Sequence, residues 1–86
     1  MEIKINLNWT FGEVVENLQT LKLQYEEVLA SFYYFDLKKA VSKKREIKKM
    51  FYSFNLKEWQ KDKIWEYMNG FETLQTLISI NERLKK

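Results

Sequence analysis

A dense group of cationic side chains between residues 38 and 49 is the part of the sequence best suited to bind a charged partner. Seven positive residues stand there against one carboxylate, a net charge of +6 in a chain whose total is +3. Phosphate groups and acidic protein surfaces are attracted by such a concentration of charge. A solvated face that only keeps the protein dissolved is the alternative interpretation. We call this segment the basic band, and its candidate contacts are Lys38, Lys39, Lys43, Arg45, Lys48 and Lys49.

The type of cation bears on what the basic band could recognise. Arg45 is its only arginine, and arginine is the usual bidentate reader of guanine. The sequence therefore favours lysine contacts to phosphates, without base specificity, over sequence-specific reading of DNA.

The residues that most enzymes need are missing from this chain. It has no histidine and no cysteine, which removes the commonest general base, the thiol nucleophile and the soft metal ligands. The carboxylate pairs Glu13/Glu16 and Glu26/Glu27 are explained by helix caps and salt bridges. We therefore expect a protein that is not an enzyme, with no cofactor, no metal and no small-molecule substrate.

The elements that must position the basic band are long helices. Proline is absent and there are two glycines, so few residues interrupt a helix. Thr10 and Glu13 form a capping box that begins the first helix. The expected helix covers residues 10–54 and either kinks or breaks, near Asp36 or Ser42. Apolar residues at 3.5-residue spacing predict that its first part packs along its whole length: Val14, Leu18, Leu21, Tyr25, Val28, Phe32 and Phe35.

On a helical wheel the basic band is amphipathic. Lys38, Arg45 and Lys49 fall within about 40° of one another at 100° per residue. The opposite side carries Leu37, Ala40, Ile47 and Phe51. The band is thus expected to face outward.

The second long helix is expected over residues 56–84, opened by a cap from Asn55 with Glu58. Asn69-Gly70 interrupts the pattern, and such a pair often ends a helix. Because the apolar stripe keeps its phase across Gly70, we favour one helix and keep a break there as the alternative. The expected inward residues are Leu56, Trp59, Ile64, Tyr67, Phe71, Leu74, Leu77 and Ile78.

Residues 1–9 follow a different pattern from the rest. Ile3, Ile5 and Leu7 alternate with polar residues, as in a half-buried strand. A lone strand must pair, most simply with the same strand of a second copy, so we expect a homodimer. An extended arm across the helices is the equal alternative. The segment resembles the opening of ribbon–helix–helix repressors, although their first helix turns after about a dozen residues.

Some apolar residues fall outside the expected core faces. They are Trp65, Tyr34, Leu23 and Ile80. Trp and Tyr are frequent anchors of protein interfaces, so we propose these four as interface residues. The alternative is that a third helical segment covers them.

Together these features predict one domain, residues 1–86, that is mainly α: a helical hairpin or three-helix bundle of long helices, preceded by a short strand or extended arm. No apolar run reaches the roughly 20 residues of a membrane span, so we expect a soluble, cytoplasmic protein. The expected function is that of a small regulator or inhibitor that binds another protein, like many phage and mobile-element accessory proteins. Nucleic-acid binding by the basic band is the alternative, and contact with an anionic membrane ranks third.

Overall fold

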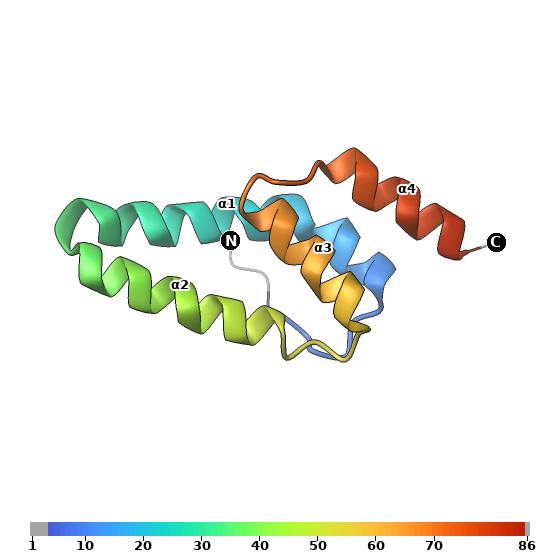
Figure 1. The fold of residues 1–86 in the computed structure, drawn as a ribbon, viewed down its shortest axis with the longest axis horizontal. Helices are drawn as coiled ribbons and strands as arrows, with labels where there is room; N and C mark the ends of the chain where they lie inside the picture. The colour runs from blue at the N-terminus through green and yellow to red at the C-terminus, as the bar shows by residue number, and fades with distance from the viewer. Residues whose placement is uncertain (1–3, 86) are drawn as a thin grey trace.

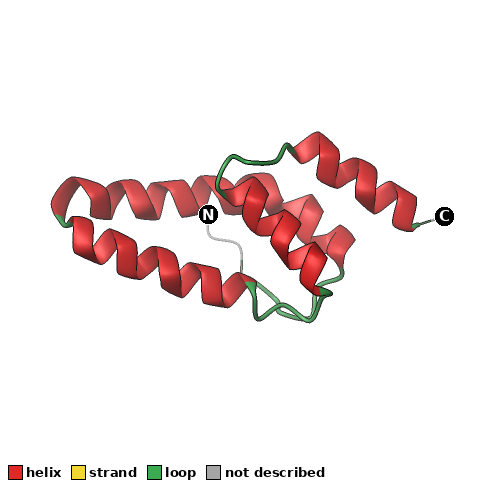
Figure 2. Ribbon diagram, viewed as in Figure 1, coloured by secondary structure: helices red, strands yellow, loops and turns green. Residues whose placement is uncertain are grey.

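The computed structural model describes residues 4–85 and contains four helices in that part of the chain. They are α1 (Phe11–Phe35), α2 (Leu37–Phe51), α3 (Glu58–Met68) and α4 (Leu74–Leu84). No residue of the described range lies in a strand (Figure 2). The expectation of a mainly α protein built as a helical bundle is confirmed.

The break between α1 and α2 lies at Asp36, one of the two positions that the sequence suggested. The Asp36 backbone N–H donates to the Phe32 carbonyl over 2.6 Å, which ends α1. Its carboxylate accepts from the Lys39 backbone N–H over 3.3 Å, which caps α2. One residue therefore ends one helix and starts the next, and the chain reverses into a hairpin (Figure 1).

The single helix expected over residues 56–84 is wrong, because the chain breaks between Met68 and Leu74. Gly70 has φ +81°, a left-handed conformation that glycine adopts without strain. The Gly70 and Phe71 N–H groups donate to the Tyr67 and Glu66 carbonyls, which is the Schellman pattern of a helix end. Local backbone geometry at Gly70 thus outweighs the continuous apolar stripe.

The cap expected at Asn55 is also wrong, since α3 begins two residues later than predicted. The Lys57 N–H donates to the Gln60 side chain at the actual helix start, over 3.0 Å. The Asn55 N–H instead donates to the Leu7 carbonyl over 2.9 Å. That bond ties the N-terminal segment to the connection between α2 and α3.

The N-terminal strand is not supported by the described residues 4–9, which form a turn and an arm. The Asn6 side-chain oxygen accepts from the Asn8 N–H over 2.9 Å, and this local bond replaces strand pairing. Ile5 and Trp9 pack against the helical core, while Leu7 is exposed. Ile3 lies outside the described residues. The alternative of an arm lying on the helices describes this segment.

The core lies at one end of the molecule. The folded molecule is 47 Å long. Helices α3 and α4 pack over the N-terminal half of α1, and the opposite end of the α1–α2 hairpin protrudes (Figure 1). The prediction that the first helix packs along its whole length is therefore wrong for its last turns. Burial in α1 stops at Leu29, because no third helix reaches beyond it.

Candidate functional site

The protruding end of the hairpin carries a group of exposed apolar side chains, which we call the hairpin tip: Tyr33, Tyr34, Phe35, Leu37 and Val41. Tyr34 and Phe35 are 87% and 84% exposed, and Leu37 is 62% exposed. The Tyr34 and Phe35 rings contact each other edge to face, with centroids 5.5 Å apart. Isolated exposed apolar residues are ordinary, but this concentration at the end of one hairpin makes the tip a candidate interaction surface.

The tip is exposed for a structural reason. Asp36 forces the reversal within a single residue, so the side chains on either side of it point away from the two-helix seam. Lys38 and Lys39 follow directly and are exposed as well. The tip is therefore an aromatic and aliphatic surface with positive charge at its edge.

The basic band lies on the outward side of α2, as its amphipathic pattern predicts. Ala40 and Phe51 are buried against the rest of the protein, whereas Lys43 is half-buried. The exposed cations of the band are Lys38, Lys39, Arg45, Lys48 and Lys49. The opposite side is not wholly covered, because Leu37 belongs to the tip.

Most cations of the basic band have no acidic partner among residues 4–85. Lys43 pairs with Glu46 over 3.4 Å, and the Lys48 ammonium lies 5.9 Å from the Tyr52 ring centroid. No ion pair within the described range involves Arg45 or Lys49. Most of the charge of the band is thus not compensated by ion pairs within the described residues.

A groove separates the basic band from the connection between α3 and α4. Its volume is about 420 Å³, and its lining residues are Val41, Lys44, Arg45, Lys48, Trp65, Glu66, Asn69 and Phe71. Phe71 is 83% exposed on its rim. The groove therefore combines three cations on one wall with an exposed aromatic ring on the other.

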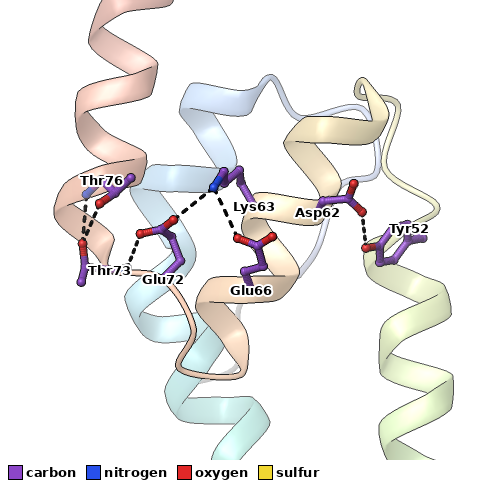
Figure 3. A network of polar contacts seen from close by, with 7 residues as sticks. All are labelled: Tyr52, Asp62, Lys63, Glu66, Glu72, Thr73 and Thr76. Atoms are coloured by element: carbon purple, nitrogen blue, oxygen red, sulfur yellow. Dashed lines mark hydrogen bonds and ion pairs between the residues drawn. The ribbon is translucent and has the colours of Figure 1, made fainter.

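A network of polar contacts fixes α3 and the start of α4 in place (Figure 3). The Tyr52 hydroxyl donates to Asp62 over 2.6 Å and joins the end of α2 to α3. Burial, together with this hydrogen bond, raises the pKa of Tyr52 to about 12. Lys63 reaches Glu66 over 3.4 Å and Glu72 over 3.2 Å, which ties α3 to the residue just before α4.

Glu72 is held in its charged form by several donors. The Thr73 backbone N–H first, and Lys63 after it, keep the pKa of the Glu72 carboxyl below its ordinary value. The Thr73 side chain accepts from the Thr76 N–H over 3.2 Å and caps α4. These groups satisfy one another, so the network joins α3 to the end of α2 and to the start of α4.

The four proposed interface residues do not form one surface. Trp65 packs against the core, with ring centroids 5.7 Å from Tyr25 and 5.9 Å from Phe51, and half-buried Ile80 also packs on the core. Trp65 and Ile80 are thus partly covered by neighbouring helices, as in the alternative interpretation. Leu23 and Tyr34 are exposed, but eleven residues of helix, about 16 Å, separate them.

Sequence reasoning missed three of the most exposed apolar residues, which are Phe35, Leu37 and Phe71. All three were expected on inward faces. Phe35 ends the 3.5-residue seam, Leu37 lies opposite the basic band on the helical wheel, and Phe71 lies on the stripe of the second expected helix. For Phe71 a signal was present, since Asn69-Gly70 directly precedes it. For Phe35 and Leu37 the signal was Asp36, a strong helix cap between two apolar residues.

Several kinds of site find no support within residues 4–85. No group of three or more His, Cys, Asp or Glu residues in that range could hold a metal ion. None of the described helices is long and apolar enough to cross a membrane. In comparisons with known proteins, no family model, curated protein or solved structure matches this chain.

Proposed function

We propose that this chain is a small regulatory or inhibitory protein that acts without catalysis, by inserting its hairpin tip into another protein. The observation that carries the proposal is the exposure of Tyr34 and Phe35 at the end of a protruding hairpin. Aromatic anchors of this kind contribute most of the binding energy at protein interfaces. They are also held on helix ends, so little conformational entropy is lost on docking.

The chemistry of the tip defines the partner surface that fits it. The apolar rings fit a hydrophobic pocket on the partner, and Lys38 and Lys39 beside them fit acidic residues around that pocket. The tip requires no rearrangement of the core, because no described element covers it (Figure 1). A second copy of the chain or an anionic membrane is a different occupant that the same experiment can reveal.

The test places a photo-reactive phenylalanine analogue at position 34, and in a matched control at position 23. Both sites are exposed on α1, at 87% and 56%, but only the first lies on the tip. We expect cross-links to a partner protein from position 34, competed by wild type and not by a Tyr34→Ser/Phe35→Ser variant. Cross-links only to a second copy, only to lipid, or equally from position 23 would contradict the proposal.

A second candidate is nucleic-acid binding by the basic band, favoured by the absence of ion pairs to Arg45 and Lys49 within the described range. Cations with no internal partner can release counterions from a phosphate backbone on binding. Affinity for an oligonucleotide should then fall steeply as salt rises. Affinity that does not change with salt, or no binding in low salt, would remove this candidate.

A further inference from the structure

The helix end at Gly70 leaves Phe71 exposed. In a Schellman motif the residue after the left-handed glycine often makes an apolar contact with the residue five or six positions before it. Here those residues are Glu66, whose carboxylate pairs with Lys63, and Trp65, whose ring packs on Tyr25 and Phe51. Phe71 stays 83% exposed, so its ring is open although Trp65 lines the same groove.

The Phe71 backbone is nevertheless fixed. Its N–H donates to the Glu66 carbonyl over 2.9 Å, and the Gly70 N–H donates to the Tyr67 carbonyl over 3.1 Å. The Lys63–Glu72 contact of 3.2 Å holds the following residue (Figure 3). An exposed aromatic residue on a fixed turn is preorganised for binding, because ordering it costs little entropy.

The facing wall of the groove supplies positive charge. Lys44, Arg45 and Lys48 line it along α2, and Trp65 contributes to its floor. The one carboxylate in the groove, Glu66, is offset by Lys63 at 3.4 Å. The Asn69 amide group donates to the Trp65 carbonyl over 2.9 Å, so this side chain is already used within the protein.

We propose that this groove binds a single-stranded nucleic acid, with a base stacked on Phe71 and the neighbouring phosphates held by Lys44, Arg45 and Lys48. Single-strand sites combine these two parts: a basic track for the backbone and an aromatic ring for an unstacked base. A duplex keeps its bases stacked on one another, so Phe71 would have no base to receive. The inference rests on the second candidate function above and is independent of the hairpin tip.

An acidic peptide fits the groove less well. An apolar peptide anchor needs a pocket that encloses it, whereas Phe71 stands on the rim with most of its surface open. An open ring beside cations suits a flat base with a phosphate on each side. Charge suits both ligands, and the open shape of the groove favours the nucleic acid.

The experiment measures fluorescence anisotropy of a labelled oligothymidylate and of a mixed-sequence duplex with the full-length protein in low salt. The single strand should bind more tightly than the duplex. Phe71→Ala should weaken single-strand binding by about 5- to 100-fold, the loss typical of one stacked base. Phe71→Trp should restore it. The matched control Phe35→Ala removes an equally exposed ring from the hairpin tip and should leave binding unchanged.

Charge variants locate the phosphate contacts. Arg45→Gln/Lys48→Gln and the control Arg83→Gln/Lys85→Gln remove the same charge from exposed cations, but only the first pair lines the groove and belongs to the basic band. The first should reduce the slope of log affinity against log salt by about 1 to 1.5, from the roughly 0.7 per phosphate contact of single strands. The control should change it little.

The outcomes separate the inference from the function on which it rests. Equal or tighter binding of the duplex, or Phe71→Ala binding like wild type, would overturn the single-strand groove while leaving the basic band as a nucleic-acid surface. No binding of either oligonucleotide would overturn both. Binding of an oligoglutamate peptide that depends on Phe71, with none of the single strand, would assign the groove to an acidic protein instead.

Discussion

The two ends of this protein use the same residue types in opposite ways. At the four-helix end, Phe54 is buried and its ring packs against Trp9 and Phe51. At the hairpin tip, Phe35 is almost fully exposed and contacts only Tyr34 among the aromatic residues described. The difference indicates that the exposure of these two aromatic side chains depends on how many helices surround them.

The length of the helices sets this difference. α1 has 25 residues, but α3 and α4 have 11 each and cover only part of it. Beyond Leu29 two helices alone face each other, and a two-helix seam cannot enclose large side chains on its outer sides. Stability is therefore concentrated at one end, and the other end is free to change its chemistry without loss of the fold.

The largest expected effect is on the free energy of unfolding, when a phenylalanine is replaced by alanine at each end of the molecule. Phe54→Ala should cost about 3–5 kcal/mol, the usual loss for a buried phenylalanine. Phe35→Ala should change the free energy of unfolding by less than about 0.5 kcal/mol, as exposed positions do. Urea unfolding followed by circular dichroism measures both. Similar losses would mean that the tip is covered in solution, for instance by a second copy.

An intermediate effect is expected at Gly70, in the turn that joins α3 to α4 at the four-helix end. Alanine at φ +81° should cost about 1–2 kcal/mol, because its Cβ is strained in the left-handed region. The matched control is Gly12→Ala, where φ is not positive and an added Cβ would lie 3.1 Å from the movable Asn81 amide. There a gain of up to about 1 kcal/mol in helix propensity offsets the tight contact.

Unfolding midpoints and the exchange rate of the Phe71 amide report the Gly70 result. The exchange rate should rise in Gly70→Ala, since the bond to the Glu66 carbonyl depends on the turn. A Gly70→Ala variant as stable as wild type, with an unchanged Phe71 amide, would show that the turn does not hold Phe71 in place.

Sequence patterns predicted the elements where local and tertiary preferences agree. The Thr10–Glu13 capping box is present, with hydrogen bonds of 3.1 and 3.2 Å, and the apolar seam is buried from Val14 to Tyr25. The outward face of the basic band follows from the same periodicity. In each case the sequence pattern and the packing of the folded protein favour the same structure.

The predictions failed beside two helix ends, where a local backbone preference decided which apolar residues are covered. Gly70 ends α3 although the apolar stripe keeps its phase there, and Asp36 ends α1 at one of the two positions that the sequence suggested. In each case an aromatic residue next to the break is exposed, although the pattern placed it inward. The periodicity of apolar residues predicts which face of a helix a side chain occupies. It does not predict whether another helix covers that face. The hairpin tip and Phe71 could therefore not be found from the stripe alone.

The smallest expected effect concerns how α4 is fastened to the four-helix end. Because donors lower the pKa of the Glu72 carboxyl in the folded state, its contribution to stability is present above the unfolded value, near 4.5, and is lost as pH falls through the folded value. Glu72→Gln should thus reduce stability at pH 7 and make no difference below the folded pKa. Amide exchange in α4 across this range measures the effect.

A pH titration can also test which donor lowers the pKa of Glu72 most. The Thr73 backbone N–H contributes most to the lowered pKa of Glu72, and Lys63 contributes less. In Lys63→Gln the carboxyl pKa, followed by the Glu72 side-chain carbon signal in NMR, should therefore rise only part of the way to its ordinary value. A full return would mean that the ion pair, and not the turn before α4, holds this carboxylate. In that case α4 would depend on salt, and the contrast with the hairpin tip would be weaker at high ionic strength.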